Sequence, residues 1–245
     1  DLINKSKYPV LYVGGGAIMS NCSGEIKKLM ERAEIPLTFT LMAAGIIPTD
    51  SPLSLGMLGM HGTYYANHAV QNCDLLIAVG ARFDDRVTGK IATFAPHAKI
   101  IHIDIDPTSI SKNVRVDIPI VGDARSVLKE LLKNVKNAKH SEWLKRISTW
   151  RKEGPLDYPK DSKLRPQYIV EKIAEMTGGD AIITTEVGQN QMWAVQFGKF
   201  LKPRTFLSSG GLGTMGYGFP AAIGAQVGQP DKVVFDIAGD GSIQM

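Results

Sequence analysis

The sequence predicts an α/β protein built from two doubly wound parallel-sheet units. Short apolar runs rich in β-branched residues recur along the chain, and most of them end in a glycine or aspartate turn before a helical pattern. The 245 residues, with 44% hydrophobic and 7% aromatic content, are enough for two ordinary globular domains. A polar, basic stretch divides the runs into two groups. We therefore expect a first domain over residues 1–140, a linker over 141–165 and a second domain over 166–245.

Charge, hydropathy and cysteine content exclude several classes of protein. The net charge is only +4, and the basic residues are spread along expected helix faces, so nucleic-acid binding has little support. The longest apolar runs are of strand length, whereas a membrane-spanning helix needs about 20 apolar residues, so we expect no membrane span. Cys22 and Cys73 have no CxxC spacing and no histidine partner. This favours ordinary reduced thiols over a disulfide or a zinc site.

The first unit begins with a strand, a glycine turn and a helix. Tyr8–Val13 is a buried strand that runs into Gly14–Gly16, and an amphipathic helix follows over Ser20–Glu34. This Rossmann-like order places a phosphate at a helix N-terminus, although glycines needed only for packing explain GGG equally well. After a strand at Leu37–Thr40, Thr40–Gly62 is a long irregular segment, which in a compact domain is usually functional.

The next strand ends in a cluster of charges. A helix over Tyr64–Cys73 precedes the strand Leu75–Val79, and GARFDDRVTG follows it. Ligands bind beyond the carboxyl ends of strands in doubly wound sheets, which favours a binding role for Arg82, Asp84, Asp85 and Arg86. A turn closed by salt bridges between these four residues is the alternative.

Two more strands complete the expected first sheet. Ile100–Ile105 carries Asp104 at its end, where a carboxylate can accept a hydrogen bond from a ribose hydroxyl. Ile118–Val121 is followed by Asp123, a suitable N-cap for the helix Ala124–Val135. In the linker, Trp143 and Trp150 are seven residues apart on one helical face, which is more typical of an anchoring stripe than of a binding site.

The second unit carries two loops at strand-to-helix junctions. A helix over Gln167–Thr177 and a strand over Ala181–Thr185 lead into Val187–Asn190, and the strand Val233–Ile237 leads into Gly239–Ser242. Both loops should open on one edge of the sheet and grip one anion from two sides. The carboxylate of GDGS suits a divalent metal that bridges protein to phosphate, although for a lone GDG an ordinary turn is the alternative.

Several stretches together resemble one known family. The stretch Ser208–Gly228 is a glycine loop that runs into a small-residue helix, and a buried strand and GDGS follow it; this order resembles the diphosphate-binding domain of thiamine-diphosphate enzymes. GGLGTMGYGFPAAIGAQVG, GARFDDRVTGK and MHGTYYANHAVQNCDLLIAVGAR look like the catalytic subunit of acetolactate synthase. The resemblance covers nearly the whole chain. It implies a central FAD-binding domain followed by the first part of a thiamine-diphosphate domain.

The resemblance also implies an activity and its partners. Enzymes of this family decarboxylate pyruvate and join the product to a second 2-ketoacid, pyruvate or 2-ketobutyrate, in branched-chain amino-acid biosynthesis. They use thiamine diphosphate, Mg²⁺ and FAD, and they form homodimers or homotetramers, in some cases with a small regulatory subunit. We expect a cytoplasmic protein if the source is bacterial, with any organelle-targeting segment outside these residues. The chain alone should be inactive, because the family's catalytic glutamate and its downstream Mg²⁺ ligand lie outside it.

The resemblance assigns roles to residues of this chain. Met215 and Arg86 are the catalytic candidates, since Met215 would hold the cofactor bent and Arg86 would meet the second ketoacid's carboxylate. Asp240 is the metal ligand. The thiamine-diphosphate candidates are Val187, Gly188, Gln189, Asn190, Gly213, Gly241 and Ser242, although the family usually has histidine in place of Asn190. The other cofactor-binding candidates lie in the expected FAD domain and are Gly14, Gly15, Gly16, Thr40, Leu41, Met60, His61, Gly80, Arg82, Asp85, Asp104 and Asp123.

Two other functions stay open at the level of sequence. A pyruvate oxidase-like enzyme shares the flavin and thiamine scaffold, although the FDDRVTG stretch argues against it. A non-catalytic nucleotide-binding fragment is the second alternative.

Overall fold

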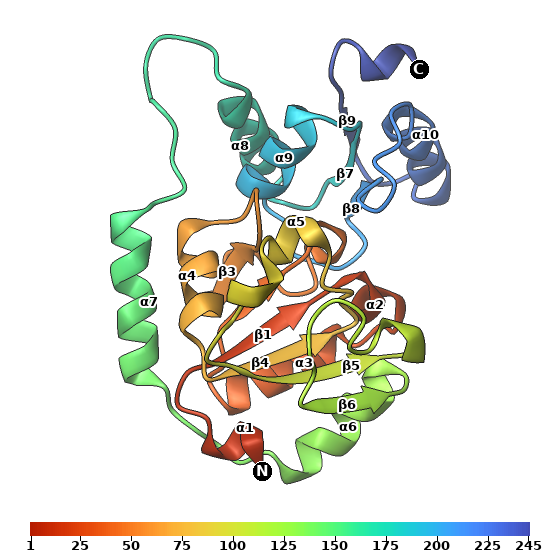
Figure 1. Cartoon of the computed structure of the whole chain (residues 1–245). Helices are drawn as coiled ribbons and strands as arrows, with labels where there is room; N and C mark the ends of the chain where they lie inside the picture. Colours follow the sequence, from red (N-terminus) through yellow and green to blue (C-terminus); the bar gives the residue numbers. More distant parts are fainter. The chain divides into compact units, whose positions relative to one another are not determined.

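The computed structural model describes all residues from Asp1 to Met245 (Figure 1). The chain divides into two compact units, of which the first comprises residues 1–43 and 52–156 and the second residues 44–51 and 157–245. No helix has both the length and the apolar character that a membrane span requires. Both cysteines are free and buried, in agreement with the prediction of reduced thiols, and burial raises the pKa of Cys22 to about 12.

The first unit contains a parallel sheet of six strands in the order β3-β2-β1-β4-β5-β6. The strands are β1 (Pro9–Val13), β2 (Leu37–Phe39), β3 (Ser54–Met57), β4 (Leu75–Val79), β5 (Lys99–Asp104) and β6 (Ile118–Val121). The strand order reverses between the neighbours β1 and β4, and every residue of these two strands is buried. Strands that are covered on both faces need continuous apolar runs, which is why the sequence identifies these two.

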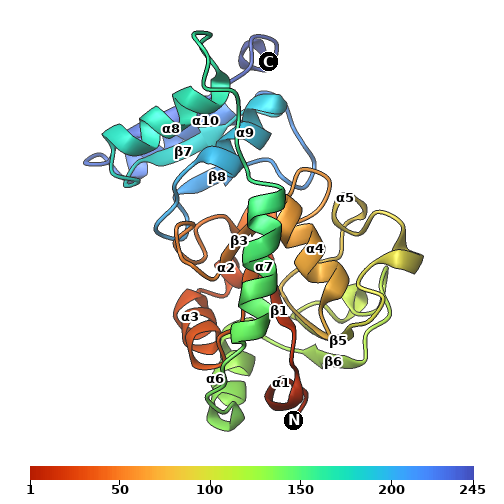
Figure 2. The same cartoon turned by 90° about the vertical axis from the view of Figure 1, so that its left-hand side faces the viewer.

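Helices cover both faces of this sheet (Figure 2). The helices of this unit are α1 (Leu2–Lys5), α2 (Gly15–Met19), α3 (Ser23–Arg32), α4 (Tyr64–Asn72), α5 (Asp85–Thr88), α6 (Ala124–Asn134) and α7 (Ser141–Glu153). Helix α3 packs beside α6, and α4 packs beside α7. Alternate strand residues such as Val10, Tyr12 and Leu76 share one hydrophobic core with α4 and α7. The doubly wound fold class is therefore confirmed for this unit.

Two details of the first unit differ from the sequence prediction. The helix expected over residues 20–34 is α3 alone, and a separate short helix, α2, begins already within the expected glycine turn, with Asn21, whose φ is 52°, between the two helices. The segment Thr40–Gly62 is not wholly irregular, because it contains β3. That strand includes Ser54 and Gly56, which are poor strand formers, and it forms because β2 offers it a hydrogen-bonding edge.

Helix α7 occupies much of the expected linker. Trp143 is fully buried, and its Nε1 donates a hydrogen bond to the Pro9 carbonyl at 3.1 Å. Its ring packs edge-on against Trp150, with 5.7 Å between the ring centroids. The two tryptophans thus anchor α7 on the first unit, as their spacing indicates. The first unit accordingly extends to Leu156, beyond the boundary expected at residue 140.

The second unit contains a parallel sheet of three strands in the order β8-β7-β9. Its elements are α8 (Pro166–Met176), β7 (Ile182–Thr185), α9 (Gln189–Phe197), β8 (Phe206–Ser208), α10 (Gly218–Gly228) and β9 (Val234–Ile237). Figure 1 shows α8 and α9 on one side of this sheet and α10 on the other. The sequence does not predict β8. Residues 44–51 belong to this unit because the Thr49 N–H donates to the Phe200 carbonyl at 3.0 Å and Thr49 Oγ1 accepts from the Phe200 N–H.

Candidate functional site

The glycine turn after β1 packs directly on the end of β4. Gly14 N–H donates to the Val79 carbonyl at 2.9 Å, and Gly16 N–H donates to the Gly80 carbonyl at 3.1 Å. A Cβ atom on Gly14 would lie 2.2 Å from the Gly80 carbonyl oxygen, so only glycine allows this approach. Packing therefore accounts for Gly14, Gly16 and Gly80. Helix α2, which follows the turn, has only five residues.

Thr40 and Leu41 lie at the end of the neighbouring strand β2. The Thr40 N–H donates to the Val13 carbonyl at 2.9 Å, which keeps the two strand ends together. Thr40 Oγ1 is buried and has no hydrogen-bond partner. Leu41 is half-buried and begins a 3-10 turn, and the next residue, Met42, lies against Gly15. A buried hydroxyl without a partner at the carboxyl edge of a sheet is a group that a polar ligand satisfies.

Phe83 anchors the charged loop after β4. Its φ is 54°, its side chain is buried, and its ring packs against Tyr12 and against His102, with centroid distances of 5.5 and 5.1 Å. Burial of Tyr12 raises the pKa of its hydroxyl, and Asp84 adds to that effect. One buried aromatic residue thus holds a loop whose neighbouring charges are exposed.

The charged residues of that loop do not pair with one another. Arg82, Asp84, Asp85 and Arg86 are all exposed, and none of them forms an ion pair within the chain. The carboxylates of Asp84 and Asp85 accept hydrogen bonds from the Arg86 backbone N–H, at 3.2 and 2.9 Å, and Asp84 is the N-cap of α5. The alternative of a salt-bridged turn is therefore wrong. The guanidinium groups of Arg82 and Arg86 remain available to bind a ligand.

Met60 and His61 come from a different part of the chain and lie against the same loop. Met60 N–H donates to the Arg86 carbonyl at 2.8 Å. Gly59 has φ of 98°, and a Cβ there would lie 2.6 Å from that same carbonyl oxygen. Met60 and His61 are exposed. The structure thus brings together two stretches that the sequence singles out separately.

Asp104 lies at the end of β5 beside a histidine that the sequence analysis does not single out. Its side chain is buried, with Oδ1 accepting from the Asp106 N–H at 2.9 Å and Oδ2 3.7 Å from His102 Nε2. Both ring nitrogens of His102 are buried without a hydrogen-bond partner. Burial lowers the pKa of His102 and outweighs the nearby Asp104 charge. The only sequence signal for His102 is a polar residue within the apolar run IIHIDI.

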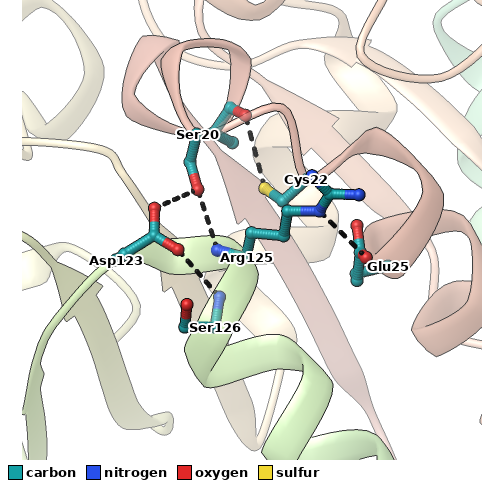
Figure 3. Close-up of polar contacts among 7 residues, drawn as sticks. Ser20, Cys22, Glu25, Asp123, Arg125 and Ser126 are labelled. Carbon is teal, nitrogen blue, oxygen red and sulfur yellow. Dashed lines mark hydrogen bonds and ion pairs between the residues drawn. The ribbon is translucent and has the colours of Figure 1, made fainter.

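Asp123 is the N-cap of α6, as the sequence predicts (Figure 3). Its Oδ1 accepts from the Ser126 N–H at 2.9 Å, and its Oδ2 accepts from the Ser20 hydroxyl at 2.6 Å. These bonds lower the pKa of Asp123. Ser20 Oγ also accepts from the Arg125 N–H, and the Arg125 guanidinium lies 3.3 Å from the carboxylate of Glu25. Both carboxylate oxygens of Asp123 are therefore engaged, Oδ1 in capping α6 and Oδ2 in joining α6 to Ser20 at the end of α2.

An open pocket of about 640 Å³ lies at the carboxyl edge of the second sheet. Three segments far apart in the sequence line it, namely Val187–Asn190, Met215 and Gly239–Ser242. Ile169 and Ile173 of α8 and Trp193 of α9 add an apolar wall. The two loops open on the same edge of the sheet, as the sequence predicts. Gly213 does not line the pocket, but its backbone has φ of 68° and lies close to Val187.

Asp240 presents an exposed carboxylate at this pocket. Its Oδ1 accepts only from the N–H of the adjacent Gly241, at 2.9 Å. Ser242 is buried and its hydroxyl closes the turn on Gly239, with 3.3 Å to both the N and O atoms of that residue. No group of three or more His, Cys, Asp or Glu residues in the chain is arranged to hold a metal. Of the two aspartates that line the pocket, Asp236 and Asp240, only Asp240 offers an exposed carboxylate to a cation.

Asn190 joins the two pocket loops. Its Nδ2 donates to the Ile237 carbonyl at 2.7 Å and to the Glu186 carbonyl at 3.2 Å. Both amide hydrogens are thus used within the protein, so a phosphate oxygen would have to displace one of these bonds. Gly188, by contrast, caps α9 without any side-chain hydrogen bond, which leaves the first N–H groups of that helix open to the pocket.

Two acidic residues beneath the pocket are missing from the sequence-based candidates. Glu186 is fully buried, and its carboxylate accepts from the N–H groups of Gly216 at 2.6 Å and Phe219 at 3.1 Å. Asp236 accepts from the Thr184 hydroxyl at 2.9 Å, and its Oδ2 is buried without a partner. Burial raises the pKa of Asp236, and the Glu186 carboxylate adds to the effect. The available sequence signal is an acid directly after a buried strand for Glu186 and an acid within the apolar run VVFDI for Asp236.

Family models match two parts of the chain. The model described as "Thiamine pyrophosphate enzyme, central domain" matches residues 1–131, and the model described as "Thiamine pyrophosphate enzyme, C-terminal TPP binding domain" matches residues 186–245. The first match lies in the part of the chain with the six-stranded sheet. The second contains all three segments that line the pocket.

Individual relatives are similar over nearly the whole chain. The chain is 53% identical to the "Probable acetolactate synthase large subunit" of Methanocaldococcus jannaschii, with 100% of the chain and 43% of that protein covered. It is 51% identical to the "Acetolactate synthase large subunit" of Cyanidium caldarium, with the same coverage of 100% and 43%. It is 47% identical to the "Acetolactate synthase isozyme 3 large subunit" of Escherichia coli, with 98% and 43% covered. The chain spans less than half the length of these relatives.

Proposed function

The chain belongs to the thiamine pyrophosphate enzymes, and on this basis we propose that it is part of the catalytic subunit of an acetolactate synthase. In this function, pyruvate is decarboxylated and the product is joined to a second pyruvate or to 2-ketobutyrate, in branched-chain amino-acid biosynthesis. The observation that carries the proposal is the pocket in which Val187–Asn190, Met215 and Gly239–Ser242 meet. The similarity to acetolactate synthases over the whole chain supports this function over the pyruvate oxidase-like alternative.

The pocket residues fit thiamine diphosphate and Mg²⁺. The open N–H groups at the start of α9, near Gly188 and Gln189, suit the diphosphate, because helix N-termini favour negative charge. The exposed Asp240 carboxylate suits Mg²⁺, with Gly241 and Ser242 beside it. When bound, the cofactor supplies a thiazolium ring that accepts the electron pair left by decarboxylation.

The other pocket residues orient that cofactor in the proposal. Met215 is 40% exposed and lines the pocket, so its flexible side chain would lie between the two rings of the cofactor and keep it bent. Gly213, which lies outside the pocket lining but two residues before Met215, would offer its carbonyl to the aminopyrimidine ring. The apolar wall formed by Ile169, Ile173 and Trp193 would contact the apolar parts of the cofactor.

The carboxyl edge of the first sheet fits FAD. The orphaned Thr40 hydroxyl, the exposed Arg82 and the buried Asp104 carboxylate lie at the ends of three of its strands, β2, β4 and β5. Ligands of doubly wound sheets bind at this edge. Leu41, Met60, His61 and Asp85 are the other proposed contacts, with the backbone of Gly14–Gly16, Gly80 and Asp123 around them. FAD takes no net redox part in the proposed reaction.

Arg86 is the proposed contact for the second ketoacid. Its guanidinium is exposed and forms no ion pair, while its backbone is held by Met60, Asp84 and Asp85. A guanidinium fork on a rigid backbone suits the planar carboxylate of a 2-ketoacid.

The proposed assembly follows from the names of the relatives. Several are called large subunits, so we propose a homodimer or homotetramer that associates with a small regulatory subunit. A cytoplasmic location is proposed for a bacterial source.

Titration of the purified chain with FAD, and separately with Mg²⁺ and thiamine diphosphate, tests the proposal. FAD binding is expected, because the first unit contains all of the proposed flavin contacts. Thiamine diphosphate should bind weakly and acetolactate should not form, because Asp240 alone cannot complete the near-octahedral shell of Mg²⁺. The full-length gene product should bind both cofactors and form acetolactate from pyruvate. A full-length product that binds neither cofactor would contradict the proposed function.

A further inference from the structure

The buried carboxylate of Glu186, beneath the pocket of the second unit, has no role in the proposed function so far. Its side chain is fully buried, directly before the pocket loop Val187–Asn190, and no lysine, arginine or histidine pairs with it. A buried charge without a partner is strongly unfavourable, so the hydrogen bonds that the carboxylate accepts must compensate for its lost hydration. These bonds come from backbone N–H groups of Gly216 and Phe219, 30 and 33 residues further along the chain.

Both N–H groups belong to the end of the glycine loop, residues 209–217, and to the helix after it. Gly216 follows Met215 directly, and its φ of 84° is a conformation that other residues rarely adopt. Phe219 is in the first turn of α10, where N–H groups have no partner inside the helix. The carboxylate of Glu186 therefore acts as a cap that reaches α10 from β7, and the helix dipole favours its negative charge.

Close packing holds the same end of the loop. Gly218 lies so near β7 and β9 that a Cβ there would be 2.4 Å from Asp236 Oδ1 and 2.6 Å from the Glu186 nitrogen. The other half of the loop is open, since Leu212 is 95% exposed and a Cβ on Gly211 would meet nothing within 4 Å. Met215 lies between the exposed part of the loop, around Leu212, and the part that is fixed by packing, around Gly216 and Gly218. Its position in the pocket therefore depends on the contacts of Gly216, Gly218 and Phe219.

We propose that Glu186 is a positioning residue that sets the place of Met215 in the pocket. It acts through the N–H groups of Gly216 and Phe219. Because Glu186 directly precedes Val187, it also links Met215 to the pocket loop Val187–Asn190. This inference rests on the proposed function, in which Met215 contacts thiamine diphosphate. The role needs two acceptor oxygens, so glutamine is not equivalent. A glutamine amide can accept one of the two bonds, but its NH₂ group then faces the other N–H.

The first test needs no cofactor and uses this chain. Amide hydrogen exchange is measured for Gly216 and Phe219 in the wild type and in Glu186→Gln, which keeps the side-chain shape. We expect exchange at one or both amides to become at least about tenfold faster in the variant. Thr185→Val is the matched control, because it removes a buried bond of the same strand, from Thr185 Oγ1 to Ser208 Oγ at 2.7 Å, without touching either amide. Unchanged exchange in Glu186→Gln, or equal acceleration in Thr185→Val, would overturn the proposal.

The second test asks whether Glu186 acts through Met215. In the full-length gene product, Glu186→Gln, Met215→Ala and the double variant are compared for kcat and for thiamine-diphosphate affinity. We expect Glu186→Gln to lower kcat at least about tenfold while the affinity changes less than about threefold, because the diphosphate contacts remain. In the Met215→Ala background the same change should have little further effect, since residues that act through one contact are not additive. Fully additive losses would refute the role, whereas a wild type that binds no thiamine diphosphate would refute the proposed function instead.

Discussion

Gly80→Ala tests whether the glycine turn after β1 and the end of β4 are held together by backbone contact. Gly80 has φ of 59°, and a Cβ there would lie 2.6 Å from the Ala17 nitrogen and 2.7 Å from two backbone atoms of Gly16. Backbone atoms cannot rotate away as a side chain can, so α2 would have to move. Gly89 is a matched control, because its φ is 56° and a Cβ there would meet nothing within 4 Å.

The expected magnitudes follow from these two geometries. Both variants place an L-residue at a positive φ, 59° at Gly80 and 56° (with ψ of −126°) at Gly89, which costs roughly 1–3 kcal/mol. Only Gly80→Ala adds an overlap with fixed atoms, which costs about 1–3 kcal/mol more. The free energy of unfolding of the first unit should therefore fall by about 2–6 kcal/mol in Gly80→Ala and by about 1–3 kcal/mol in Gly89→Ala.

Urea denaturation followed by tryptophan fluorescence measures this difference. Trp143 and Trp150 lie in α7 of the first unit, whereas Trp193 lies in the second, so a Trp193→Phe background isolates the first transition. FAD affinity, measured by flavin fluorescence, should fall at least about tenfold in Gly80→Ala, because α2 and its glycine turn border the proposed flavin site. Equal losses of stability in the two variants would show that contact with α2 is not what requires glycine at position 80.

Three further predictions concern single charged groups. In the full-length gene product, Asp240→Asn should weaken Mg²⁺ and thiamine-diphosphate binding together, by at least about tenfold, and an unchanged cofactor affinity would remove the metal assignment. Arg86→Ala should raise the concentration of the second ketoacid that the condensation step requires far more than it slows pyruvate decarboxylation. Lys90→Ala, the control, should change neither quantity. Equal loss in both half-reactions would show that Arg86 has a structural role instead. Hydrogen bonds from Lys232 and Lys202 lower the pKa of Asp180 from 3.8 to about 2, so its contribution to stability is present above pH 3.8 and is lost as the pH falls toward 2. The urea midpoint reported by Trp193 should therefore fall less over this range in Asp180→Asn, and an identical pH dependence would contradict the assignment.

Local patterns predict those parts of the fold that are buried on both faces. The runs Pro9–Val13 and Leu75–Val79 are apolar throughout, because helices cover both sides of β1 and β4. The short strands β3 and β8 have no such signal. Ser54–Met57 and Phe206–Ser208 become strands because β2 and β7 offer them hydrogen-bonding edges, and an edge is not visible in the sequence of the strand that joins it.

Pattern and spacing also predict where the candidate site lies but not which atoms are in contact. The motifs VGQN and GDGS predict two loops at one edge of a sheet, and Met215 joins them there. Spacing alone leaves open whether Arg82 and Arg86 pair with Asp84 and Asp85, and the structure leaves all four without an ion pair.

By itself, the sequence determined the element types, the doubly wound class and the family, because these depend on residue periodicity and on motifs that are each continuous in the chain. It also determined Asp123 as the cap of α6, since a cap and its N–H partner are only three residues apart. Only the tertiary structure decided that Ser20 takes the other oxygen of Asp123, that Met60 lies on Arg86 and that Glu186 holds the loop of Met215. These contacts join residues separated by 26 to 103 positions. No local pattern encodes them, because each depends on which distant segments the folded chain brings side by side.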